Sequence, residues 1–228
     1  MFLALIGGAV YSGFAHLVGS GHLARARRVL AEADRGYLAA GALAAALYMA
    51  LNRTFMELWV GPAQYGGHLL TVLLGLNVLL VGRAALITYL LGGSGQIRQS
   101  AHLTFFEAVV RVAAILALLL AIGIPGVPLA GIATTAVSAL VALRWLGRRL
   151  EGPEAEGTMR TGAAWPAYAI LLAAGAAAGG ERWSASWAGF VAAGAVFTLA
   201  GAGLLGAMDP AARALAAGGM RALRRGAA

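Results

Sequence analysis

Long apolar windows divide this chain and most constrain its fold. They lie at about residues 1 to 19, 37 to 60, 66 to 91, 101 to 123, 126 to 147, 161 to 179 and 185 to 207. At about 1.5 Å per residue, helices of this length cross a hydrocarbon core of roughly 30 Å. The windows are continuously apolar, whereas the strands of a membrane barrel alternate over about ten residues. The sequence therefore predicts an all-α, polytopic transmembrane helix bundle with about seven spans.

The composition also indicates a membrane protein. Of 228 residues, 61% are hydrophobic and 11% are charged, and the mean hydropathy is +0.80. These values lie outside the usual range of soluble domains. The net charge of +8 does not predict nucleic-acid binding, because no basic face with aromatic residues or recognition motif accompanies it. The chain has no cysteine and four scattered histidines, so we expect neither a metal site nor a cofactor.

The arginines are distributed unequally between the two ends of the windows. Only Arg182 follows an even-numbered window, whereas thirteen arginines lie at or after the ends of odd-numbered windows. Cytoplasmic loops retain an excess of Lys and Arg, so the N-terminus is predicted to lie outside and the C-terminus in the cytoplasm. We expect the chain to reside in the inner (plasma) membrane. The arginines on the expected cytoplasmic side are Arg25, Arg27, Arg28, Arg35, Arg98, Arg144, Arg148, Arg149, Arg160, Arg213, Arg221, Arg224 and Arg225.

Besides Arg144 at the end of the fifth window, five residues that are charged at neutral pH lie inside the windows. Arg53 with Glu57, and Glu107 with Arg111, are each four positions apart, which places both members of a pair on one helix face. Arg83 has no such neighbour. A charged side chain near the centre of a span costs about 2.5 to 3.5 kcal/mol unless it is paired, reaches the membrane surface or faces water. These residues therefore require an explanation.

Two interpretations stay open. In the first, the charged side chains near the window ends reach the aqueous surfaces of the membrane and have no further role. In the second, they line a polar lumen together with Asn77, which lies near the middle of the third window. The second interpretation gives the candidate substrate-binding residues Arg53, Glu57, Asn77, Arg83, Glu107 and Arg111.

Two stretches of the chain carry a resemblance to a known family. These are FMELWVGPAQYGG at 55 to 67 and GQIRQSAHLTFFEAVVRVAAILALLLAIGIPGVPLAGIATTAVSALVALRWL at 95 to 146. They resemble polysaccharide biosynthesis flippases of the multidrug, oligosaccharidyl-lipid and polysaccharide exporter superfamily. The shared features are a span ending in Trp-Val-Gly, a cytoplasmic Ile-Arg before a span with an early Glu, and the following Gly-rich turn. The resemblance covers about residues 1 to 150.

The resemblance implies a transporter of two helical lobes around a central cavity, which flips a lipid-linked oligosaccharide by alternating access. It further implies that Arg83 and Arg111 contact a diphosphate and that Glu107 orients Arg111 or takes part in ion coupling. Flippases of this family are about twice as long as this chain. We therefore expect the C-terminal half of such a transporter, either as a fragment or with a separate chain supplying the N-terminal lobe.

The expected organisation follows the chain in order. Residues 1 to 150 form the flippase-like lobe, 151 to 160 a cytoplasmic linker, 161 to 207 two extra transmembrane helices, and 208 to 228 a basic cytoplasmic tail. No catalytic triad or acid dyad is present in the sequence, so we do not expect an enzyme. Two alternatives remain: a small-molecule or drug exporter of the same superfamily, and a membrane scaffold protein without transport activity. The expected partners are the lipid bilayer and a lipid-linked oligosaccharide.

Overall fold

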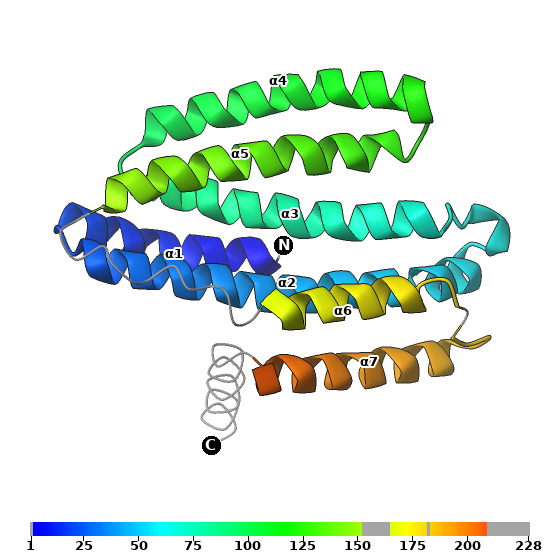
Figure 1. Cartoon of the computed structure of the whole chain (residues 1–228). Helices are drawn as coiled ribbons and strands as arrows, with labels where there is room; N and C mark the ends of the chain where they lie inside the picture. Colours follow the sequence, from blue (N-terminus) through cyan, green and yellow to red (C-terminus); the bar gives the residue numbers. More distant parts are fainter. Residues whose placement is uncertain (1, 152–164, 182, 209–228) are drawn as a thin grey trace. The chain divides into compact units, whose positions relative to one another are not determined.

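The computed structural model describes residues 2 to 151, 165 to 181 and 183 to 208, and within these ranges the chain is helical without any strand (Figure 1). The prediction of an all-α fold is confirmed. The expected linker and basic tail lie, apart from their first residues, outside the described residues. The elements are α1 (Phe2–Gly19), α2 (Leu23–Trp59), the short 3₁₀ helix η1 (Pro62–Gln64), α3 (His68–Gly93), α4 (Ile97–Ile122), α5 (Gly126–Leu150), α6 (Trp165–Ala178) and α7 (Trp187–Met208).

Five of the described helices, α2, α3, α4, α5 and α7, are long and apolar enough to cross a membrane. The chain therefore has the features of a membrane protein. The expectation that the first and sixth windows also cross the bilayer stays a prediction. The helix of the sixth window, α6, is described over 14 residues, from Trp165 to Ala178.

Helix α2 differs most from the sequence prediction. A loop was expected between the first and second windows, but α2 begins at Leu23 and has 37 residues. The connection from α1 is a tight turn in which Gly21 adopts a positive φ of 78°. The segment after it is rich in Ala, Leu, Arg and Glu, which favour helix even in water. The hydropathy pattern marked where the apolar part of this helix begins, and the helix itself starts about four turns earlier.

The helices group into two compact units. One unit contains α1, α2 up to Tyr37, α3 from Leu76, α4 and α5. The other contains α2 from Leu38, α3 up to Gly75, α6 and α7. We refer to them as the α4–α5 unit and the α6–α7 unit. The division of the chain at residue 150 inferred from the sequence stays a prediction.

The α4–α5 unit brings arginine-bearing helix ends together. The end of α3 and the start of α4 meet the end of α5, where Arg149 Nε donates to the Ser94 carbonyl at 3.4 Å. Gln96 Nε2 donates to the Trp145 carbonyl, also at 3.4 Å. The α4–α5 turn lies at the opposite end of these helices (Figure 1). Arg98, Arg144, Arg148 and Arg149 therefore belong to one end of this unit.

Helix α4 is exposed along its whole described length. None of its residues is buried, and large apolar side chains cover its outer surface. Examples are Phe105, Phe106, Val109 and Leu116. In water such a surface is unfavourable, but acyl chains are as apolar as these side chains. The exposure of α4 agrees with a helix that contacts lipid.

The α6–α7 unit is held together by small residues that allow helix backbones to approach. A Cβ atom at Gly175 of α6 would lie 2.5 Å from the Ala46 carbonyl oxygen of α2, and one at Gly179 would lie 2.3 Å from that of Met49. Close contact between small residues drives helix association in membranes, where burial of apolar surface from water gives little. The core of the unit consists of Leu38, Ala39, Ala42, Ala46, Ala167, Tyr168, Leu171 and Leu205.

Candidate functional site

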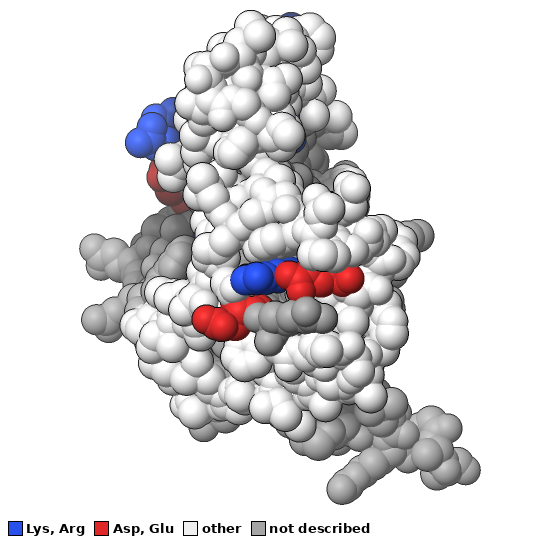
Figure 2. All heavy atoms as spheres, turned by 90° about the vertical axis from the view of Figure 1, so that its right-hand side faces the viewer, with Lys and Arg blue, Asp and Glu red and all other residues white. Residues whose placement is uncertain are grey.

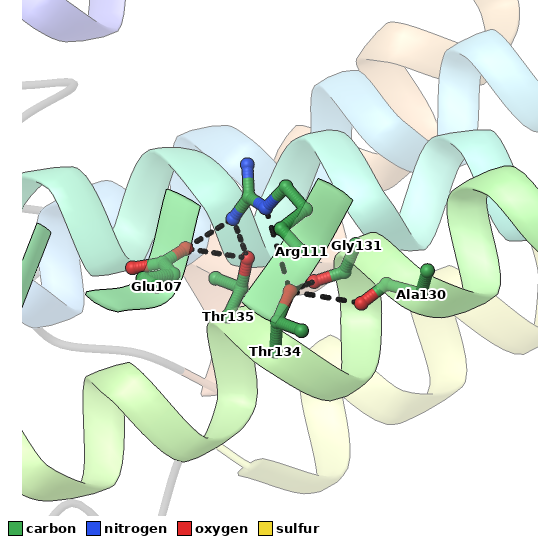
Figure 3. A network of polar contacts seen from close by, with 6 residues as sticks. All are labelled: Glu107, Arg111, Ala130, Gly131, Thr134 and Thr135. Carbon is green, nitrogen blue, oxygen red and sulfur yellow. Dashed lines mark hydrogen bonds and ion pairs between the residues drawn. The ribbon is translucent and has the colours of Figure 1, made fainter. Parts of the chain in front are cut away.

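Glu107 and Arg111 form an ion pair on α4 that reaches two threonines of α5 (Figure 3). Arg111 Nη2 donates to Glu107 Oε1 and to Thr135 Oγ1. Arg111 Nε lies 3.4 Å from Thr134 Oγ1, and the Thr135 hydroxyl donates to Glu107 Oε1 at 3.3 Å. The predicted pairing of Glu107 with Arg111 is confirmed. We refer to these four residues as the α4–α5 network.

The two threonines belong to this network but were not among the candidate residues predicted from the sequence. Thr135 is only 1% exposed, and the Thr134 hydroxyl donates to the Ala130 carbonyl at 2.8 Å. Their position depends on the close approach of α4 and α5 at the turn, where a Cβ atom at Gly126 would lie 2.4 Å from the Leu118 carbonyl oxygen. The two adjacent threonines inside an apolar window indicate a contact with another helix, because hydroxyls within a span usually face another helix.

Part of the hydrogen-bonding capacity of the ion pair is left over. Among the described residues, Arg111 Nη1 and Glu107 Oε2 make no hydrogen bond, and Figure 3 shows both atoms without a dashed line. The side chains are 29% and 17% exposed, so both remain accessible. The pair therefore presents one N–H donor edge and one carboxylate oxygen to its surroundings.

A cavity of about 350 Å³ adjoins this pair and runs along the faces of α3 and α4. It is open to the surface, because Tyr89, Ala85 and Thr104 on its wall are exposed. Its wall combines apolar, hydroxyl and charged groups, as expected of a site for an amphipathic ligand. The lining residues are Val81, Ala84, Ala85, Thr88, Tyr89, Ser100, Thr104, Glu107 and Arg111.

Arg83 is paired, contrary to the expectation that it stands alone. Its Nε and Nη2 donate to the two carboxylate oxygens of Asp34 at 2.8 and 2.9 Å, a bidentate ion pair between α3 and α2. The side chains are 19% and 9% exposed. A Cβ atom at Gly82 would overlap the Tyr37 side chain of α2, so glycine allows the two helices to approach here. Asp34 was missed because its segment was expected to be a loop outside the membrane.

The cavity beside the α4–α5 network and the Arg83–Asp34 pair lie on different faces of α3. The cavity is lined by Val81, Ala84 and Thr88, which share one face because they are three or four residues apart. Arg83 is about 200° around the helix from Val81 and does not line the cavity. The structure therefore unites Glu107 with Arg111 but does not place Arg83 beside them.

Arg53 and Glu57 form the second ion pair that the spacing predicted, and it belongs to the α6–α7 unit. Arg53 Nε donates to Glu57 Oε1 at 2.9 Å, and Nη1 donates to the Gly180 carbonyl in the α6–α7 connection. The guanidinium also lies 5.9 Å from the centre of the Tyr65 ring. Trp183 joins the same connection to α2 by donating from its indole N–H to the Ala50 carbonyl at 3.1 Å. These contacts tie α2 to the α6–α7 connection.

Charged side chains of opposite sign lie side by side on the face shown in Figure 2, within a surface made largely of other residue types. The salt bridges of the described residues are Arg53–Glu57, Arg83–Asp34 and Arg111–Glu107. Pairing lowers the cost of placing charge within apolar helices.

Asn77 lies at a close contact between α3 and α5. A Cβ atom at Gly131 would lie 2.4 Å from Asn77 Oδ1, and that oxygen is buried without a hydrogen-bond partner among the described residues. Asn77 does not line the cavity beside Glu107. The structure thus places it in a helix contact rather than in that cavity.

Comparisons of the whole chain with protein-family models, with curated proteins and with solved structures found no match.

Proposed function

We propose that this chain is part of a membrane transporter that flips lipid-linked polysaccharide precursors across the inner membrane by alternating access. The observation that carries the proposal is the Glu107–Arg111 pair, which sits on an apolar helix long enough to span the bilayer and borders an open cavity. The resemblance to polysaccharide flippases supports the substrate class. In this account the cavity receives the polar end of the substrate, while its lipid chain remains beside the exposed surface of α4.

A purely structural ion pair explains these contacts less well. A carboxylate and a guanidinium inside a membrane protein are costly, and a pair that serves only packing is best fully satisfied by neighbouring groups. Here one nitrogen and one oxygen remain accessible, and the wall beside them carries the hydroxyls of Thr88, Ser100 and Thr104. Such a surface is suited to contacts with a polar ligand that enters and leaves.

The proposal includes an orientation and a second lobe. The end of the α4–α5 unit that carries Arg98, Arg144, Arg148 and Arg149 is the cytoplasmic end, because positively charged residues are retained on that side. With α6 and α7 each crossing the membrane, the C-terminus lies in the cytoplasm. The lobe that completes the translocation path is supplied by a longer form of the protein or by a separate chain.

Substitutions in the ion pair test the proposal. In cells that naturally carry this protein, we expect the variants Arg111→Ala and Glu107→Gln to reduce surface polysaccharide by about tenfold, because each leaves one charge of the pair without its partner. Deletion of the gene should reduce surface polysaccharide to the same extent. Lipid-linked precursors should accumulate on the cytoplasmic side. The matched control is Arg144→Ala, which removes an exposed arginine of the same unit and should leave export unchanged. Normal surface polysaccharide in the deletion strain would contradict the proposal.

The same strains distinguish the alternatives. If efflux of hydrophobic drugs, but not polysaccharide export, depends on Glu107 and Arg111, the protein is a small-molecule exporter. If the deletion abolishes export while both variants retain it, a scaffold role fits better, since packing through Gly and Ala faces would then suffice.

A further inference from the structure

The charge of the cavity decides which part of a substrate it suits. Among its lining residues, only Arg111 carries a positive charge at neutral pH and only Glu107 a negative one, so their formal charges cancel. A diphosphate brings about two negative charges, and removing them from water requires several cationic or N–H groups in compensation. The cavity offers one guanidinium, and that group is already shared with a carboxylate.

No second arginine supplements Arg111 at this wall. Arg83, the other arginine considered for a diphosphate, binds both carboxylate oxygens of Asp34 and lies on a different face of α3. Recruiting it would break a bidentate pair and leave Asp34 alone. The cavity is therefore poorly matched to a strongly anionic group.

The groups that remain match a neutral polyol. A sugar hydroxyl both donates and accepts, so neighbouring hydroxyls can donate to Glu107 Oε2 and accept from Arg111 Nη1. The hydroxyls of Ser100 and Thr104 donate to the carbonyls of Thr88 and Ser100 at 3.2 and 3.0 Å. Their oxygen lone pairs therefore remain as acceptors for further sugar hydroxyls.

The apolar part of the wall fits the same ligand. The Tyr89 side chain is 55% exposed at the cavity, and an aromatic ring provides a flat apolar surface for the C–H face of a pyranose. The volume of about 350 Å³ lies at the lower end of the range of roughly 300 to 1,000 Å³ for small-molecule sites. It suits one or two sugar rings better than a large glycan.

We infer that the cavity lined by Tyr89, Glu107 and Arg111 binds an uncharged sugar unit of the substrate, and that the diphosphate is bound elsewhere. This inference rests on the proposed function, because it assigns one part of the proposed substrate to this site. It departs from the expectation that Arg111 contacts the diphosphate.

Binding measurements on the purified full chain test the inference. The chain is placed in lipid nanodiscs without glycoside detergent, and titrated with two probes: a short-chain diacylglycerol monohexoside, which has no phosphate, and farnesyl diphosphate, which has no sugar. We expect saturable binding of the monohexoside, weakened about tenfold by Glu107→Gln or Arg111→Met, since each removes one charge-assisted hydrogen bond. The affinity for farnesyl diphosphate should not change.

A second variant guards against effects on folding. Tyr89→Ala removes an exposed ring and should weaken monohexoside binding about fivefold, with an unchanged thermal unfolding midpoint. Its matched control is Tyr48→Ala, an exposed tyrosine of α2 outside the cavity, which should have no effect on binding. The inference is overturned if the monohexoside fails to bind, if its affinity is the same in all variants, or if Arg111→Met weakens binding of the diphosphate.

The two proposals fail in different ways. Monohexoside binding that depends on Glu107, in a protein whose deletion leaves polysaccharide export intact, would refute the transport function and retain the sugar site. Export that depends on Glu107, with monohexoside binding that does not, would refute the sugar site and retain the transport function.

Discussion

The variant Arg83→Ala is expected to lower the free energy of unfolding by about 3 kcal/mol, because it leaves the carboxylate of Asp34 without its partner. The two hydrogen bonds of this pair measure 2.8 and 2.9 Å, and the Asp34 side chain is 9% exposed, so water compensates only in part for their loss. Thermal or denaturant-induced unfolding of the protein in lipid nanodiscs measures the loss.

Two further variants distinguish the effect of leaving Asp34 unpaired from the effect of removing an arginine charge. The double variant Asp34→Leu/Arg83→Met should recover most of the stability, because replacing both partners removes the unpaired charge. Arg144→Ala, at an exposed position of α5, should change the unfolding free energy by less than about 0.5 kcal/mol. A single Arg83→Ala variant as stable as the original protein would show that the ion pair with Asp34 does not form.

Substitution of Gly175 by valine is expected to destabilise the α6–α7 unit by about 3 kcal/mol, at the upper end of the cost of overpacking. The first atom of the new side chain would lie 2.6 Å from the Ala46 Cα and 2.5 Å from its carbonyl oxygen. Backbone atoms cannot move aside as a flexible side chain can, so α6 must separate from α2. Limited proteolysis and thermal unfolding measure the effect.

The matched control for this substitution is Gly203→Val in α7. A Cβ atom at Gly203 meets no other atom within 4 Å, so the same change of side chain in another helix should cost little. If both valine variants unfold at the same temperature as the original protein, the contact between α6 and α2 is not as close as described.

Helix positions were largely predictable because long apolar windows leave few alternatives to a helix. The start of α2 was not, because Arg25, Arg27 and Arg28 lie outside the apolar windows but inside the helix. Propensity and hydropathy report different properties, and here they give different helix limits.

The candidate site was predictable only where its contacts are local in sequence. The pairs Arg53–Glu57 and Glu107–Arg111 follow from a spacing of four residues on one helix. The partner of Arg83 is 49 residues away in the chain, on another helix, and no local pattern connects the two. Thr135 was missed for the same reason, since its role depends on the packing of α5 against α4.

Thiol labelling tests the central claim most directly. The claim is that the face of α4 with Glu107 and Arg111 borders a water-accessible cavity. The chain has no cysteine, so single cysteines can be introduced without background. The two positions to compare are Thr104, which lines the cavity, and Leu116, which does not. Leu116 is 57% exposed on α4 and lies about as far from its nearer helix end as Thr104 does. Thiols react with a charged, membrane-impermeant thiosulfonate as thiolates, which form in water rather than in lipid.

The account predicts that, in open membrane fragments, Thr104→Cys reacts at least about tenfold faster than Leu116→Cys, because only the first thiol ionises readily in water. Addition of the monohexoside should slow the reaction of Thr104→Cys and leave that of Leu116→Cys unchanged. Equal, slow labelling of both cysteines would place Glu107 and Arg111 against lipid and contradict the account.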